Sequence, residues 1–100
     1  MPYAMIRDAI RRRESLTAHY DQYIRYFSPH ALGEDREGRD AVLGYQYGGG
    51  RRGGLPMAGD WCFFSVLGLT ATRTNGDPWL IGPLLGKPMH LFKTIHVQCD

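Results

Sequence analysis

Residues 15–30 read SLTAHYDQYIRYFSPH, and this stretch decides the fold class. Apolar and polar residues alternate along residues 16–20 and again along residues 23–27, which is the two-residue period of a half-buried β-strand. Asp21-Gln22 separates the two runs and predicts a tight turn. The stretch is therefore expected to be a β-hairpin. Pro29 should end its second strand or lie on an edge, because proline has no N–H to donate to a neighbouring strand.

Three stretches beyond the hairpin also have strand character. Residues 40–47 (DAVLGYQY) combine a short Val-Leu core with two tyrosines that alternate on one face. Residues 61–70 (WCFFSVLGLT) are aromatic, β-branched and apolar, and are expected to form one buried strand. Residues 90–98 (HLFKTIHVQ) alternate again and are expected to pair back into the sheet as its last strand.

Residues 4–13 (AMIRDAIRRR) differ from the rest, because their apolar side chains recur at helical spacing. They predict one short amphipathic helix with basic residues in the last turn, where the helix dipole favours them. Residues 48–54 (GGGRRGG) resist regular structure and predict a loop that extends to residue 60, while residues 75–88 are expected to be irregular. One helix and about five short strands predict a mainly β fold, built as a small barrel or a strongly bent sheet.

The composition limits what this chain is expected to be. Its 100 residues are 43% hydrophobic and 22% charged, which is typical of one folded soluble domain. No apolar run is long enough for a spanning helix or a signal peptide, so a cytoplasmic protein without a membrane partner is expected. The net charge of +2 gives no general attraction to nucleic acid, although a local basic patch still matters.

A search for reactive groups predicts no enzyme, no metal site and no cofactor. None of the four histidines lies in a serine or cysteine nucleophile signature. Cys62 lies in an aromatic strand, where an inert thiol is expected. His96-x-x-Cys99 is only half of a zinc site. The glycine run lacks the Lys-Ser/Thr ending of a phosphate-binding P-loop, so nucleotide hydrolysis is not expected either.

Arginines give the sequence its strongest binding signal. Arg51 and Arg52 stand between glycines, an arrangement that suits single-stranded nucleic acid as well as a solvated hairpin tip. Arg25 shares a strand face with Tyr23 and Phe27, where it is placed either to pair with phosphate beside stacked bases or to cover aromatic surface as a structural residue.

Several of these residues together resemble the WYL domain family, most closely its short stand-alone bacterial members. The resemblance covers residues 4–73 and rests on Ala9-Ile10, Arg12-Arg13, Leu16, Tyr20, Arg25, residues 28–33 (SPHALG) and residues 38–45 (GRDAVLGY), with Arg51 or Arg52 before the aromatic strand. Where the family has its eponymous Trp-Tyr-Leu, this chain has Asp40-Ala41-Val42.

The resemblance implies that residues 1–100 form a single WYL-like domain with an Sm-like small β-barrel after a short N-terminal helix. It implies a ligand-sensing or nucleic-acid-binding module of the kind often attached to transcription regulators. The family's ligand-facing arginines match Arg25 and either Arg51 or Arg52, and His30 and Tyr45 are further candidates. The expected ligand is single-stranded nucleic acid or a nucleotide-like anion.

An alternative function follows from the same sequence without any nucleic acid. A sheet edge or the helix of residues 4–13 would then pair with a protein partner or with a second copy of the chain. The two hypotheses differ in what they predict for Arg25, because only the first requires its charge for binding.

Overall fold

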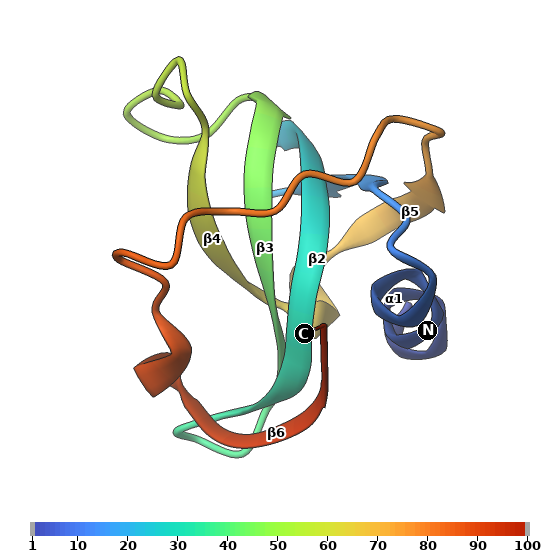
Figure 1. The fold of residues 1–100 in the computed structure, drawn as a ribbon, viewed down its shortest axis with the longest axis vertical. Coiled ribbons are helices and arrows are strands. Elements are labelled where there is room, and N and C mark those ends of the chain that lie inside the picture. The colour runs from blue at the N-terminus through green and yellow to red at the C-terminus, as the bar shows by residue number, and fades with distance from the viewer. Residues whose placement is uncertain (1, 100) are drawn as a thin grey trace.

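The computed structural model describes residues 2–99, so residues 1 and 100 of the expected domain lie outside the described part. The chain is mainly β, with six antiparallel strands in one open sheet and a short N-terminal helix (Figure 1). The elements are α1 (Tyr3–Arg12), β1 (Leu16–Tyr20), β2 (Tyr23–Asp35), β3 (Asp40–Gly49), β4 (Asp60–Ser65), a 3₁₀ turn (Val66–Gly68), β5 (Thr70–Thr74), a second 3₁₀ turn (Met89–Leu91) and β6 (Phe92–Gln98).

The strand order of the sheet is β4-β3-β2-β1-β5, and β6 pairs with the far half of β2. Strands β1 to β4 follow one another as antiparallel neighbours, as short connections favour. The chain then passes through the 3₁₀ turn Val66–Gly68 from one end of this order to the other, where β5 pairs with β1. The long strand β2 therefore has three partners and forms the centre of the fold.

The predicted hairpin is confirmed. Strands β1 and β2 pair from Leu16↔Phe27 to Tyr20↔Tyr23, and the turn residues Asp21 and Gln22 have φ values of 50° and 69°. Two left-handed residues in a two-residue loop match the right-handed twist of the flanking strands. The helix is confirmed as well and buries Ile6, Ala9 and Ile10.

Pro29 does not end its strand, because β2 continues to Asp35. The alternative, that the proline lies on an edge, holds locally: β2 pairs with β1 only up to Phe27 and with β6 only from Ala31 on. On its other side Pro29 pairs with Gly44 of β3, and the register shift that follows leaves out His30. Pro29 O accepts from Trp79, so the missing N–H faces the side that has no strand partner.

The single strand predicted over residues 61–70 is also wrong. β4 ends at Ser65, the chain turns, and β5 begins at Thr70. Two smaller corrections concern the loops: Gly48 and Gly49 belong to β3, and residues 89–91 form a 3₁₀ turn before β6. Residues 75–88 are irregular, as predicted.

Each face of the sheet carries its own apolar cluster. The first cluster, on the side of α1, includes Ile6, Phe27, Val42 and Phe64 among its buried members. The second cluster contains Ala31, Ala41, Leu43, Trp61 and Phe92. In Figure 1 the irregular segment after β5 crosses in front of β2, β3 and β4. We call this segment, residues 75–88, the strap.

Hydrogen bonds from the sheet hold the strap in place. Trp79 Nε1 donates to Pro29 O at 3.2 Å, and Leu80 N donates to Ser28 Oγ at 2.9 Å. Farther along, Trp61 Nε1 donates to Pro83 O at 2.9 Å. The strap therefore takes the place of a covering layer on the second face. Among residues 2–99, no helix is long and apolar enough to cross a bilayer.

Candidate functional site

Arg25 lies in β2 with its side chain among the aromatic residues of the first cluster, and only 5% of its surface is exposed. Its guanidinium carbon lies 5.4 Å from the ring centre of Tyr20, and 5.5 Å from the centres of Tyr23 and Phe64. These distances are within the range of cation–π attraction. Arg25 Nε also donates to Tyr20 O at 3.3 Å, which holds the side chain across the hairpin.

The guanidinium of Arg25 is paired with no carboxylate of the described residues. None of the ion pairs within residues 2–99 includes it. Its second hydrogen-bond acceptor is the neutral amide oxygen of Gln46, 3.2 Å from Nη1. Burial of a cation is costly unless an opposite charge or strong acceptors replace water. The aromatic rings offset part of this cost, and an anion at this place would offset more.

Gln46 connects Arg25 to the glycine-rich loop. The residue is fully buried in β3, and its Nε2 donates to Gly48 O at 2.9 Å and to Gly50 O at 3.0 Å. Its Oε1 accepts from Arg25 and from Cys62 Sγ, the latter at 3.2 Å. One amide therefore fixes both the guanidinium of Arg25 and the backbone where the loop begins.

Arg51 joins the same assembly from the loop. Its Nη2 lies 3.0 Å from Asp60 Oδ2, its Nε donates to Gly54 O at 3.1 Å, and its Nη1 lies 3.9 Å from Cys62 Sγ. We call Arg25, Gln46, Cys62, Arg51 and Asp60 the arginine network. The sequence left open whether Arg51 or Arg52 faces a ligand with Arg25. In the structure, Arg51 contacts Cys62, Cys62 is hydrogen-bonded to Gln46, and Gln46 accepts from Arg25, so the two arginines are linked. The exposed Arg52 is outside the network.

Cys62 acts within this network as a thiol. Burial raises its pKa, and the nearby guanidiniums of Arg51 and Arg25 counteract only part of that increase. A thiol with a raised pKa is a weak nucleophile at neutral pH and retains its proton for donation to Gln46.

His30 lies apart from the arginine network, beneath the strap. Its ring stacks on Trp79 at 4.4 Å and meets Trp61 edge-on at 4.7 Å. Gly82 N donates to Nε2 at 3.1 Å, so Nδ1 carries the proton and donates to Ser28 O at 2.7 Å. Burial lowers the pKa of His30 from 6.5 to about 4, with a smaller contribution from Lys87. Both ring nitrogens are thus used inside the protein, and the ring anchors the strap.

Tyr45 is the remaining candidate, and it also lies with the second cluster. Its ring meets Trp61 at 5.4 Å, and its hydroxyl donates to Ala58 O. The sequence candidates therefore separate into two groups: Arg25 and Arg51 in one network, and His30 and Tyr45 around Trp61 on the other face.

The sequence reasoning missed Gln46 and Asp60, which complete the network. Gln46 stands two residues beyond Gly44 and four beyond Val42, so a regular strand places it on the core side. A polar residue on the buried face of a strand was an available signal. Asp60 gave no such signal, because it belonged to a predicted loop.

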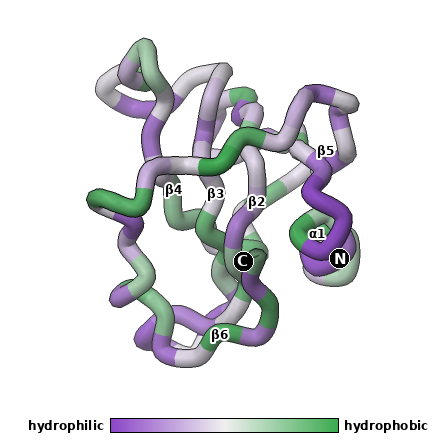
Figure 2. The backbone as a smooth tube through the Cα atoms, in the orientation of Figure 1, coloured by the Kyte–Doolittle hydropathy of each residue, from purple (hydrophilic) through white to green (hydrophobic). Residues whose placement is uncertain are grey.

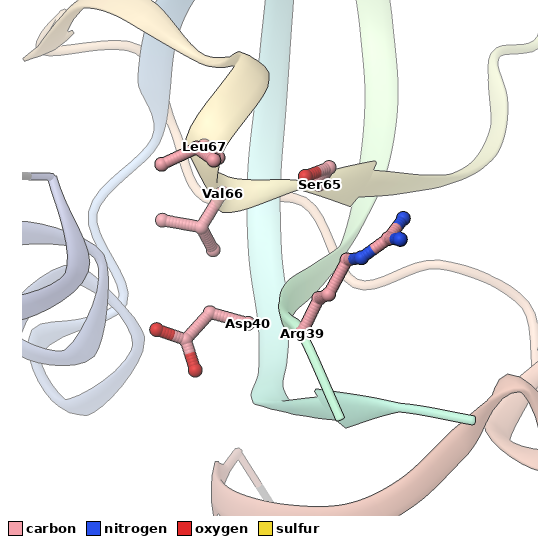
Figure 3. A pocket seen from close by; sticks show the side chains of 5 residues that line it. All are labelled: Arg39, Asp40, Ser65, Val66 and Leu67. Atoms are coloured by element: carbon pink, nitrogen blue, oxygen red, sulfur yellow. The ribbon is translucent and has the colours of Figure 1, made fainter. Parts of the chain in front are cut away.

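Three of the cavities within the described residues have volumes of about 230, 240 and 270 Å³, and neither Arg25 nor Arg51 lines any of these three. Figure 3 shows the first, between the start of β3 and the end of β4, where Val66 and Leu67 lie opposite Asp40 and Arg39. Within residues 2–99, no group of histidine, cysteine or acidic side chains is arranged to hold a metal ion. The arginine network therefore combines the buried Arg25 and Gln46 with the partly exposed Arg51 and Asp60, and its arginines lie outside these three cavities.

Comparison with models of protein families, with curated proteins and with solved structures finds no match to this chain.

Proposed function

We propose that this protein is a non-catalytic module that binds single-stranded nucleic acid or a nucleotide-like anion at the arginine network. The observation that carries the proposal is Arg25, a guanidinium with 5% exposure and no carboxylate partner within residues 2–99. A buried cation held ready without its own counter-ion is complementary to an oxyanion from outside. Arginine is also suited to phosphate, because its planar fork donates two parallel hydrogen bonds.

The surroundings of Arg25 support a nucleotide rather than a simple inorganic anion. Tyr23 is exposed at the start of β2, and its ring centre lies 5.5 Å from the guanidinium carbon of Arg25. Aromatic rings beside a cation are typical of surfaces that stack bases while they bind the backbone. Arg51 adds a second cation from a loop whose glycines leave room for a chain to approach.

The proposal includes an Sm-like small barrel and kinship with WYL domains. Support comes from the order of the strands: β4 and β5 lie at opposite ends of it, a 3₁₀ turn joins them directly, and β5 pairs with β1. Ala41 and Val42, two of the three residues at the eponymous position, are both buried. In this chain they contribute to the core and not to a ligand-facing surface.

A titration of labelled single-stranded DNA and RNA, followed by fluorescence anisotropy, tests the function. Two arginine–phosphate contacts predict a slope of about −1.4 in log affinity against log salt, hence a loss of about sevenfold between about 50 and about 200 mM salt. We expect Arg25→Met, which removes the charge but retains much of the apolar bulk, to weaken binding about tenfold or more.

Three variants serve as controls for that titration. Arg51→Gln should weaken binding and reduce the salt slope by about 0.7, whereas Arg52→Gln should change neither by a comparable amount. Arg11→Gln removes the same charge from the exposed side of α1 and should bind like the parent protein. If Arg25→Met and Arg11→Gln lost affinity equally, net charge alone would explain the loss, and the proposed site would be contradicted.

Exposed apolar residues of the strap favour protein association as a second candidate function. Ile81, Leu84 and Leu85 are 71%, 84% and 93% exposed, and Figure 2 shows hydrophobic residues along the strap and at its outer turn. Such side chains on a segment held by hydrogen bonds form the kind of surface that partners cover.

We expect sedimentation equilibrium to show a mass that rises with protein concentration if a second copy covers these residues. The double variant Leu84→Ser, Leu85→Ser should then remain monomeric, while Leu67→Ser, which removes an equally exposed leucine beside β4, should not change the mass. A parent protein that stays monomeric at every concentration excludes self-association through the strap.

A further inference from the structure

Arg51 differs from Arg25 in that every nitrogen of its guanidinium group already has a partner. Nη2 is paired with Asp60 Oδ2, Nε with Gly54 O and Nη1 with Cys62 Sγ. The backbone closes the same turn, because Gly54 N donates to Arg51 O at 3.0 Å. These contacts use three of the five N–H donors of the guanidinium, and the one directed at Asp60 is the charge-paired one, so a ligand oxyanion competes with Asp60 for this group.

Among these partners, the Asp60 carboxylate is the one that most resembles a ligand phosphate. Within residues 2–99, this carboxylate is the only acid that forms an ion pair with either arginine of the network, and carboxylate oxygens bind guanidinium as phosphate oxygens do. The ion pair is also accessible, with side-chain exposures of 27% for Arg51 and 46% for Asp60. Ion pairs at such exposure contribute little free energy, so an incoming anion can displace the carboxylate.

Asp60 is itself held in position at the start of β4. Its other oxygen, Oδ1, accepts from Trp61 N at 2.9 Å, so the side chain is oriented by the strand. The adjoining loop has open space around two of its glycines, since a Cβ atom at Gly53 or Gly54 would meet no atom within 4 Å. The carboxylate is thus fixed, and the segment that carries Arg51 has space to move away from it.

We propose that Asp60 is an internal counter-ion that occupies the place of a ligand phosphate on Arg51, and that a bound oxyanion displaces it. This inference rests on the proposed function and adds its regulation: Asp60 holds the site in a low-affinity state. Arg25 supplies a cation with no carboxylate partner within residues 2–99, and the Arg51 donor that Asp60 holds becomes available only when the ligand outcompetes Asp60. Phosphate groups, as diesters in a strand or as the terminal group of a nucleotide, are the ligand chemistry that fits both arginines.

The test is the variant Asp60→Asn, measured with labelled single-stranded DNA and with inorganic pyrophosphate as competitor. Asparagine keeps an oxygen that can accept from Trp61 N but has no charge to compete for Arg51. We expect binding of the DNA to become about two- to fivefold tighter, as the loss of an exposed ion pair implies. Displacement by pyrophosphate in both proteins identifies the phosphate group, and not the base, as the ligand of the arginine network.

Two further variants separate this effect from a general change of charge. Asp21→Asn removes one negative charge from the β1–β2 turn without touching Arg51 and should change affinity by less than about twofold. In an Arg51→Gln background, Asp60→Asn should give no gain, because the partner that it releases is gone. Thermal unfolding of each variant checks that the fold is intact.

The outcomes distinguish this inference from the proposed function on which it depends. Binding by the parent protein that Asp60→Asn leaves unchanged overturns the counter-ion role alone, as does an equal gain in the Arg51→Gln background. Absence of binding in the parent protein and in Asp60→Asn overturns the proposed function, and the counter-ion role with it.

Discussion

The free energy of unfolding is expected to fall by about 3 kcal/mol when the pH is lowered from 6.5 to 4, because of His30 alone. Burial lowers the pKa of this ring from 6.5 to about 4 in the folded protein. Between those two values the unfolded chain binds a proton that the folded chain does not, so protons favour unfolding. Stability is therefore fully present above pH 6.5 and declines as the pH falls toward 4.

Structural reasons make this dependence large. Protonation of Nε2 removes the acceptor of the hydrogen bond from Gly82 N, and it places a charge between Trp61 and Trp79. Urea unfolding at a series of pH values measures the effect. His30→Phe retains an aromatic ring but has no titrating group, so its curve should be flatter by about 3 kcal/mol over the same interval.

The nuclear magnetic resonance signal of the His30 ring provides a second measurement, independent of whether His30→Phe folds. The folded protein should show a midpoint near 4 for this ring. A midpoint near 6.5, together with a His30→Phe curve parallel to that of the parent protein, would mean that the ring is not buried under the strap.

Gly82→Ala is expected to destabilise the protein by about 3 kcal/mol, at the upper end of the cost of overpacking. A Cβ atom at this position would lie 2.3 Å and 2.5 Å from two atoms of the Trp61 ring. The ring has little freedom to move, because Trp61 Nε1 donates to Pro83 O and its faces and edges contact His30 and Tyr45. Gly82 must instead move away from the sheet, which breaks the hydrogen bond from its N–H to His30 Nε2.

Chemical unfolding of a set of variants measures this cost and its origin. In a Trp61→Phe background the smaller ring leaves space, and Gly82→Ala should cost about 1 kcal/mol or less. Gly48→Ala is the matched control in the sheet, because the three atoms nearest to its Cβ atom would all belong to the Tyr26 side chain, the closest at 3.3 Å. Equal costs for Gly82→Ala with and without Trp61 would show that the strap does not pack as described.

The sequence predicted those parts of the fold that depend on local pattern. The hairpin of β1 and β2 follows from a two-residue period around Asp21-Gln22, and α1 follows from its apolar spacing. Strand β5 carries no such signal: TATRT has no large apolar residue, and four of its five residues are exposed. It is a strand because the chain returns to β1 after the 3₁₀ turn, which is a tertiary property.

The continuation of β2 past Pro29 was hidden for a similar reason. Proline is tolerated there because β2 has no strand partner on one side between the end of its pairing with β1 and the start of its pairing with β6, and the proline carbonyl oxygen accepts from Trp79 in the strap. Neither this gap in the pairing nor the strap is visible in the residues around Pro29. Local rules therefore failed where partners distant in the sequence satisfy the backbone.

The candidate site was likewise predictable from residue type but not from the pairing of distant strands. Arg25 and Arg51 were identified as separate basic residues, but their connection requires the register of three strands, in which Gln46 pairs with Phe27 on one side and with Asp60 on the other. His30 was identified by its place in a motif. The structure shows that both of its ring nitrogens are already hydrogen-bonded to the protein beneath the strap. Residue type pointed to the chemistry, while strand register determined which residues meet.

The central claim is that Arg25 and Arg51 bind the same ligand, and the arginine Nε–Hε resonances of ¹⁵N-labelled protein test it most directly. On addition of unlabelled single-stranded DNA, the account predicts that the signals of Arg25 and Arg51 shift together and saturate at the same ligand concentration. The signal of Arg36, which donates to His90 O elsewhere, should not move. Saturable binding that leaves the Arg25 and Arg51 signals unchanged would contradict the account.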